Sequence, residues 1–180
     1  MSYRDELLDL LVKKSLKKGD FTLSSGQKST YYIDGKLTTL DSRGAFLVGR
    51  ILLAMLADDV PDAVGGLTLG ADPIVGSILS LAGMEDLELK GFIVRKQAKE
   101  HGTQSLVEGP LEKGDRVVVV EDVLTTGSSS LKAIQAVRDI GCTVDRVLAV
   151  VDREQGAREN LKKAMCRAES IFSVNELLRA

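Results

Sequence analysis

Hydrophobic and polar positions alternate along this chain in two different ways. In residues 7–16 and 42–57 the apolar side chains recur about every 3.6 positions, which predicts two amphipathic helices, the first of them ending near Gly19. Shorter runs rich in valine, isoleucine and leucine predict strands, with a further short strand at residues 31–34. These runs occupy residues 63–67, 91–94, 116–120, 146–151 and 170–174. Most of them are separated by helical stretches, at residues 73–82, 129–140 and 155–165.

Two of the strand-like runs, VVVV and VLAVV, are continuously apolar. Strands read this way when helices cover both faces of their sheet. We therefore expect an α/β fold with a mostly parallel central sheet flanked by helices, formed by residues 1–180 as a single domain. In such a sheet ligands bind beyond the carboxyl ends of the strands.

Composition narrows the function. The net charge is −2, so no basic surface indicates nucleic-acid binding, and no stretch is apolar for long enough to span a membrane. Cys142 and Cys166 are the only cysteines and match neither a disulfide framework nor a zinc spacing. We expect a cytoplasmic protein that binds neither nucleic acid nor membranes.

The segment VVVVEDVLTTGSSSLKA, residues 117–133, carries the most chemistry. A buried strand leads into Glu121 and Asp122, and a turn of small hydroxyl residues and glycine then leads into a helix. The N–H groups of such a turn, with the helix dipole, make a site for a phosphate dianion. Two carboxylates beside an anion need another task, and binding the cis hydroxyls of a ribose is one. The alternative interpretation is an ordinary capped helix with an exposed acidic pair.

A second cluster, Arg95 to Gly102, holds three cations and the only histidine of the chain. It begins a polar stretch, residues 96–110, that is long for a loop in so compact a chain. Taken in isolation, this cluster would be interpreted as a solvated charged loop with a surface histidine. Beside a phosphosugar site it is suited to a pyrophosphate leaving group, whose charge needs cations as the bond breaks.

Residues 117–133 resemble the phosphoribosyl-pyrophosphate signature of type I phosphoribosyltransferases. Together with FTLSSGQKSTYYID, GGLTLGADPIVGSI, FIVRKQAKEHGTQSLVEG and VVDREQGARENL, in that order, they resemble the orotate phosphoribosyltransferase family over residues 5–178. The resemblance implies transfer of a phosphoribosyl group to N1 of orotate, with Mg²⁺ as cofactor. It also implies a homodimer with shared active sites and a small hood built by about residues 1–40 and the C-terminal segment.

The resemblance assigns roles residue by residue. Arg95, Lys96, Lys99 and His101 match the loop that grips pyrophosphate, with Lys99, His101 and Asp122 as the catalytic group. Glu121, Asp122, Val123, Leu124, Thr125, Thr126, Gly127, Ser128 and Ser129 match the ribose-phosphate cradle. Thr125 and Arg153 match the orotate contacts, and the guanidinium fork of Arg153 suits a carboxylate. No protein side chain is expected to bind the metal directly.

The chain departs from the family at two places. Ser24 stands where many relatives have a lysine, and Leu69-Gly70 stands where others have an aromatic-lysine pair. The glycines of the turn at residues 66–72 are suited to close backbone approach to pyrophosphate, or they simply serve the strand-to-helix turn. Two rival functions are a purine phosphoribosyltransferase and a non-enzymatic sensor of phosphoribosyl pyrophosphate. A purine phosphoribosyltransferase would need an aromatic residue to clamp the purine where this chain has Asp152-Arg153-Glu154. A sensor would need a basic face, which this chain does not offer.

Overall fold

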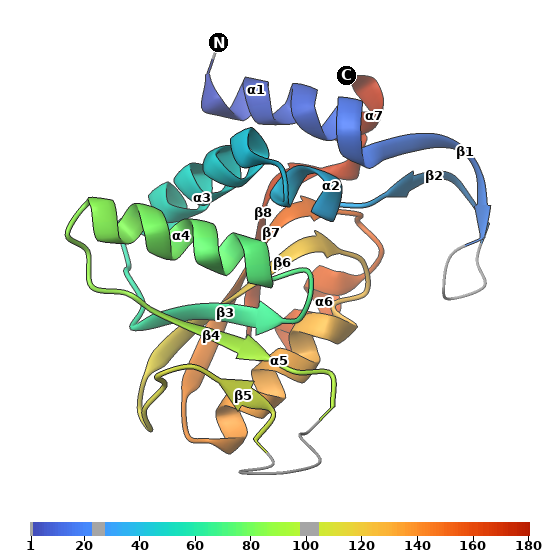
Figure 1. Ribbon diagram of the computed structural model, residues 1–180. Helices are drawn as coiled ribbons and strands as arrows, with labels where there is room; N and C mark the ends of the chain where they lie inside the picture. Colours follow the sequence, from blue (N-terminus) through green and yellow to red (C-terminus); the bar gives the residue numbers. More distant parts are fainter. Residues whose placement is uncertain (1, 23–27, 98–104) are drawn as a thin grey trace.

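A six-stranded sheet forms the centre of the computed structural model, which describes residues 2–22, 28–97 and 105–180 (Figure 1). Its strand order is β5-β4-β3-β6-β7-β8. The strands are β3 (Ala63–Leu67), β4 (Lys90–Val94), β5 (Val107–Glu108), β6 (Arg116–Leu124), β7 (Thr143–Asp152) and β8 (Arg167–Ser173). The helices around it are α3 (Ser42–Leu56), α4 (Asp72–Met84), α5 (Ser128–Asp139) and α6 (Ala157–Lys163). In the described part of the chain, no helix has the length and apolar character needed to cross a bilayer.

Five of the six strands run parallel, and only β5 is antiparallel to its neighbour. This confirms the predicted α/β fold. After β3 the chain adds β4 on one side, and after β5 it crosses over to add β6 on the other side of β3. The strand order therefore reverses between β3 and β6, and this switch point is where open parallel sheets form their ligand crevice.

The valine run of β6 shows why its sequence does not alternate. Val117 and Val119 pack into one core with α5, whereas Val118 and Val120 pack into the other core with α3 and α4. Both faces of the strand are buried, so every position is apolar. The strand is held from both sides up to the point where its two carboxylates begin.

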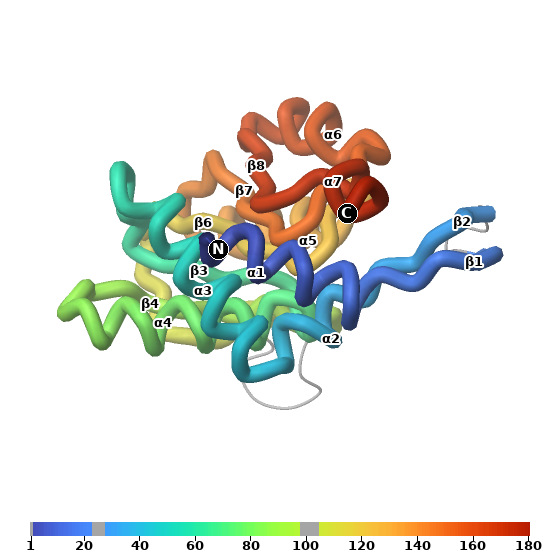
Figure 2. Tube along the Cα trace, turned by 90° about the horizontal axis from the view of Figure 1, so that it is seen from above, coloured from blue at the N-terminus to red at the C-terminus, as the bar shows by residue number. Residues whose placement is uncertain are grey.

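The N-terminal region differs from the prediction of one helix ending near Gly19. Helix α1 (Tyr3–Leu10) continues as a π-helical turn, η1 (Leu11–Ser15), and the chain then becomes strand β1 (Leu16–Thr22). It pairs antiparallel with β2 (Lys28–Ile33), and the two form a hairpin that projects from the body (Figure 2). The prediction was wrong because the strand exists only through its pairing with β2, which a helical period cannot reveal.

Two short helices were also missed. Helix α2 (Lys36–Thr39) follows the hairpin, and α7 (Val174–Arg179) follows β8 with a capping box between Ser173 and Glu176. Helix α7 lies beside α1, where Arg4 bonds to the Ile171 carbonyl and to Glu176. The two ends of the chain are thus joined on the same side of the sheet.

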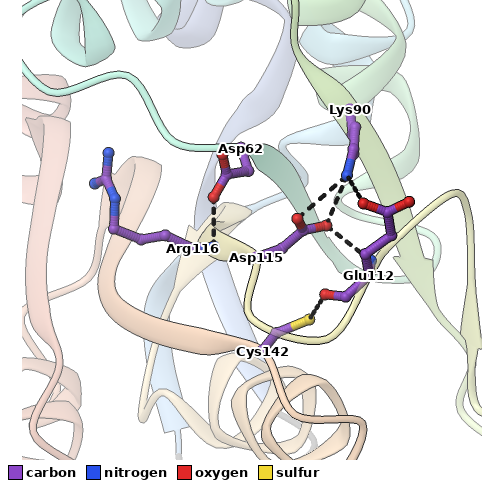
Figure 3. A network of polar contacts seen from close by, with 6 residues as sticks. All are labelled: Asp62, Lys90, Glu112, Asp115, Arg116 and Cys142. Carbon is purple, nitrogen blue, oxygen red and sulfur yellow. Dashed lines mark hydrogen bonds and ion pairs between the residues drawn. The ribbon is translucent and has the colours of Figure 1, made fainter.

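Polar contacts join the amino-terminal ends of β3, β4, β6 and β7, on the side of the sheet opposite to the carboxyl ends that form the ligand crevice (Figure 3). The Lys90 ammonium lies 3.1 Å from Asp115 Oδ2 and 3.2 Å from Glu112 Oε2, and the Glu112 N–H donates to Asp115. That N–H and the ammonium hold the pKa of Asp115 below its ordinary value. Asp62 accepts from the Arg116 N–H, and the Cys142 thiol donates to the Glu112 carbonyl.

We expect Asp115→Ala to lower the free energy of unfolding by about 1–3 kcal/mol, because it leaves the Glu112 N–H and Lys90 without their buried acceptor. Urea denaturation measures this. Glu112→Ala is the matched control, since its carboxylate is 79% exposed and its ion pair is screened by solvent. Equal losses in the two variants would contradict this account.

Candidate active site

The predicted site residues that the structure describes gather at the carboxyl ends of β3, β4, β6 and β7. The turn of residues 68–71 follows β3, Arg95 and Lys96 follow β4, the acidic pair lies in the last four residues of β6, and Arg153 follows β7. The Thr68 N–H donates to the Val94 carbonyl, and the Arg153 N–H donates to the Leu124 carbonyl. These two bonds tie the loops in pairs on either side of the switch point.

Glu121 is buried at the end of β6, with 8% of its surface exposed. Its Oε2 accepts a hydrogen bond of 3.0 Å from the hydroxyl of Ser130, in the first turn of α5. Burial, and then repulsion from Asp122, raise the pKa of Glu121 to about 8. At neutral pH the free site therefore holds this carboxyl mainly in its protonated form.

Asp122 is 9% exposed, and burial raises its pKa as well. Its Oδ1 accepts the N–H of Val123 at 2.9 Å, and the positive charge of Lys36 opposes the rise. Lys36 itself is held by Asp34 at 2.7 Å. The acidic pair is thus not an exposed pair beside a capped helix, because both members are enclosed.

Glycines allow two loops to approach Asp122. A Cβ at Gly70 would lie 2.6 Å from Asp122 Oδ1, and a Cβ at Gly35 would lie 2.9 Å from Asp122 Cβ. The Gly70 turn, where the Thr68–Leu69 peptide bond is cis, is fixed by a bond of 2.8 Å from the Thr68 hydroxyl to Asp72. The glycine at residue 70 therefore serves close backbone approach, beyond any need of the turn.

The predicted phosphate cradle is a tight turn onto a helix. Gly127 has a φ of +80° and precedes α5, whose first helical bond is donated by Leu131 to the Gly127 carbonyl. The N–H groups before Leu131 therefore have no acceptor within the helix, and they lie at its positive end. Asn160 braces the turn by donating to the Thr126 carbonyl at 3.0 Å. Val123 and Leu124 pack into the two cores and anchor the start of the turn.

Arg153 lies beside this turn with an unusual environment for an arginine. It is 7% exposed, and its Nε and Nη2 atoms have no hydrogen-bond partner among the described residues. The Tyr31 ring, from the hairpin, lies 5.0 Å from its guanidinium carbon. A buried charge with unpaired donors is costly unless a ligand supplies the acceptor, and a planar carboxylate fits this fork.

The cation cluster is described only in part. Arg95 lies at the end of β4, 3.6 Å from Glu108 of β5, and Lys96 is exposed. Lys99 and His101 lie outside the described residues. The expected loop of residues 96–110 contains β5, which pairs with β4 and was not predicted.

Sequence reasoning missed four residues that border the site. Ser130 stood within the quoted segment without a role, and Tyr31, Gly35 and Lys36 stood in the hairpin and α2. Only the fold brings the last three to β6 and β7, so no local signal identified them. Within the described ranges, no group of three or more His, Cys, Asp or Glu side chains could hold a metal.

Comparisons with known proteins agree with this geometry. The phosphoribosyl transferase domain family matches residues 40–176. Orotate phosphoribosyltransferase of a Nostoc species is 48% identical over 97% of this chain and 84% of its own length. The Aquifex aeolicus enzyme of the same name is 48% identical over 99% of both chains.

Solved structures extend the likeness to the whole fold. Mycobacterium tuberculosis orotate phosphoribosyltransferase, in complex with Fe(III) dicitrate, superposes with a TM-score of 0.86 at 43% identity, covering 98% of this chain and 99% of that one. A structure of the same enzyme in complex with 5-phospho-α-D-ribosyl 1-diphosphate gives a TM-score of 0.83 at 39% identity, over 98% and 99% of the two chains. With this coverage and identity, the chain belongs to the orotate phosphoribosyltransferase family.

Proposed function

We propose that this enzyme carries out its family's reaction through the residues gathered beyond β6. It transfers the 5-phosphoribosyl group of phosphoribosyl pyrophosphate to N1 of orotate, giving orotidine 5′-monophosphate and pyrophosphate in de novo UMP biosynthesis. The observation that carries the proposal is a buried acidic pair followed by a glycine turn onto a helix N-terminus. At the end of the neighbouring strand lies buried Arg153, whose Nε and Nη2 have no hydrogen-bond partner among the described residues.

Each part of the two substrates has a complementary surface. The N–H groups of the turn at residues 125–129 bind the 5′-phosphate, and Glu121 and Asp122 bind the ribose hydroxyls. The orotate carboxylate takes Arg153, with Thr125 beside the ring. Pyrophosphate takes the backbone of the turn at residues 68–71 and the side chains of Arg95 and Lys96. The family resemblance adds Lys99 and His101 as the catalytic cations at the leaving group.

The protein contributes positioning and electrostatics rather than a nucleophile. The ring nitrogen of orotate attacks the anomeric carbon while pyrophosphate leaves, so positive charge builds on the ribose. The carboxylate of Asp122, next to the ribose, stabilises that charge in its ionised form. The cations of the loop at residues 95–101 take up the charge that develops on pyrophosphate.

Mg²⁺ fits this site, because a nearby cation would favour the ionised forms of Glu121 and Asp122, whose pKa values burial raises. We assign its ligands to pyrophosphate and ribose oxygens, and no protein side chain is needed to hold it. When bound, it neutralises and orients the leaving group.

The enzyme acts as a homodimer with shared active sites, in this proposal. Leu40, just after α2, is 72% exposed, and Leu69 of the pyrophosphate turn is 64% exposed. Each lies close in sequence to a glycine at which an added Cβ would collide with Asp122. Apolar side chains exposed beside a site support a covering partner subunit. The hood is formed by the hairpin, α1, α2 and α7. The two buried, free cysteines fit a cytoplasmic location.

A mixing experiment tests the shared site. Lys99→Ala and Asp122→Asn subunits should each form nearly inactive dimers. If Lys99 acts in the neighbouring site, each mixed dimer has one intact site, and re-equilibrated mixtures should recover up to about a quarter of the wild-type activity. No recovery, in a mixture shown by mass spectrometry to have exchanged subunits, would refute the shared site.

The reaction itself is tested by following orotate absorbance with phosphoribosyl pyrophosphate and Mg²⁺. Uracil and hypoxanthine are the control bases, and Asp122→Asn is the control protein, with circular dichroism confirming that it is folded. Consumption of hypoxanthine instead would favour a purine phosphoribosyltransferase. Binding of phosphoribosyl pyrophosphate without turnover of any base would favour a sensor.

A further inference from the structure

Ser130 has no role in the proposed reaction, yet it is fully buried at the base of the cradle. It is the third residue of α5, and its hydroxyl donates to Glu121 Oε2 at 3.0 Å, between two side chains that are both shielded from water. Helix and strand are thus joined by a buried polar bond at one of the two carboxylates predicted to bind ribose.

A serine inside a helix usually bonds back to the carbonyl four residues earlier. Ser80 of α4 does this, donating to the Gly76 carbonyl at 2.9 Å. For Ser130 the corresponding carbonyl belongs to Thr126, and it accepts from Asn160 instead. The hydroxyl of Ser130 is directed across to the strand, to a carboxylate that accepts from no other side chain among the described residues.

We propose that Ser130 is a positioning residue for ribose recognition, which holds the Glu121 carboxylate in place and joins it to the helix that forms the phosphate cradle. The inference rests on the proposed function, since it takes Glu121 as a ribose ligand. One helix then presents N–H groups to the 5′-phosphate and a hydroxyl to the carboxylate that binds the same sugar. The helix therefore fixes the distance between the binding site of the 5′-phosphate and that of the ribose hydroxyls.

The bond favours the ionised carboxylate, the form that accepts hydrogen bonds from ribose. Asp122 is the charged neighbour on the same strand and opposes ionisation, with Lys36 and Asp34 of the hood beyond it. Without the Ser130 hydroxyl, burial and Asp122 act unopposed, and the pKa of Glu121 rises further. Substrate binding must then remove a proton that is held more tightly.

Three variants separate positioning from packing. Ser130→Ala removes the hydroxyl, Ser130→Thr retains it, and Ser77→Ala removes a comparable helix hydroxyl, bonded to the Ala45 carbonyl at 2.6 Å, away from the site. The readout is kcat/KM for phosphoribosyl pyrophosphate between about pH 6 and pH 9.5, at saturating orotate. Since one pKa unit is a factor of ten, Ser130→Ala should lose about tenfold at pH 7 and regain most of it at pH 9. Its KM for orotate should stay unchanged.

Ser130→Thr should retain the wild-type pH profile, and Ser77→Ala should leave it unmoved. A loss in Ser130→Ala that is equal at every pH, or no loss at all, would overturn the proposal. A second measurement does not use the Ser130 variants, and circular dichroism checks that its one variant, Glu121→Gln, is folded. Calorimetry in buffers of different ionisation enthalpy should show that the wild-type enzyme releases more protons on binding phosphoribosyl pyrophosphate at pH 7 than Glu121→Gln does. Equal release would also overturn it.

The proposed function fails separately. A wild-type enzyme that does not consume orotate would refute the reaction, whatever Ser130 does. An active wild-type enzyme whose pH profile is unchanged in Ser130→Ala would refute only the positioning role.

Discussion

Replacing Arg153 with alanine is expected to lower kcat/KM for orotate roughly 30- to 1,000-fold, which corresponds to a loss of about 2–4 kcal/mol of transition-state stabilisation. The orotate carboxylate would lose its charge partner in a site that excludes water. The Kd for phosphoribosyl pyrophosphate should change little, because the cradle and the acidic pair are untouched. Steady-state kinetics with varied orotate, together with calorimetric titration of phosphoribosyl pyrophosphate, measure the two effects separately.

Arg146 is the matched control for Arg153, because each arginine is 7% exposed. Arg146 is bonded to Glu169 at 2.8 Å and to the Met55 carbonyl at 2.9 Å, whereas two nitrogens of Arg153 have no partner among the described residues. Arg146→Ala should therefore lower stability by on the order of 2 kcal/mol and leave selectivity for orotate over uracil intact. Arg153→Ala should show the reverse. Unchanged orotate kinetics in Arg153→Ala would remove this residue from the site.

Glu121→Gln is expected to weaken catalysis while stabilising the free protein at alkaline pH. The ordinary pKa of glutamate is 4.5, and in the folded protein that of Glu121 is raised to about 8. Between these values the folded state holds a proton that the unfolded chain releases, so wild-type stability is lost as pH rises through this window. Glutamine carries no such proton, and its variant should not share the loss.

The size of the effect has an upper bound. The difference between about 4.5 and about 8 corresponds to at most about 5 kcal/mol, with smaller values if water enters the site. Urea denaturation at pH 5, 7 and 9 should show the free energy of unfolding of the wild type falling relative to that of Glu121→Gln. In the kinetic assay, the kcat/KM of Glu121→Gln should be about 100-fold below that of the wild type. Parallel stability profiles for the two proteins would show that Glu121 does not titrate in this window.

The sequence predicted the sheet well, because continuous apolar runs such as residues 117–120 have only one good explanation. It failed where structure depends on distant partners. Strand β1 needs β2, and β5 needs β4, so neither has a period of its own. Helix α7 has only six residues, too few to show a helical period, and it depends on its contact with α1.

The candidate site divides in the same way. Glu121, Asp122 and the turn after them form one continuous motif, and Arg153 follows a recognisable strand, so local chemistry indicated them. The burial that raises the pKa of Glu121 is a property of packing and could not be derived from the motif. The contribution of Tyr31 and Lys36 depends on how the N-terminal hairpin and α2 fold back over the sheet.

Gly70 has a consequence for how this branch of the family can change. The family resemblance implies that some relatives have an aromatic-lysine pair where this chain has Leu69-Gly70, so a lysine at residue 70 would be expected to add one useful cation. Here any side chain at residue 70 would begin 2.6 Å from an oxygen of Asp122. A lysine at residue 70 therefore requires the carboxylate of Asp122 to shift, and that shift would disturb the proposed ribose site. We expect residues 70 and 122 to be energetically coupled, so that a substitution at one changes the effect of a substitution at the other.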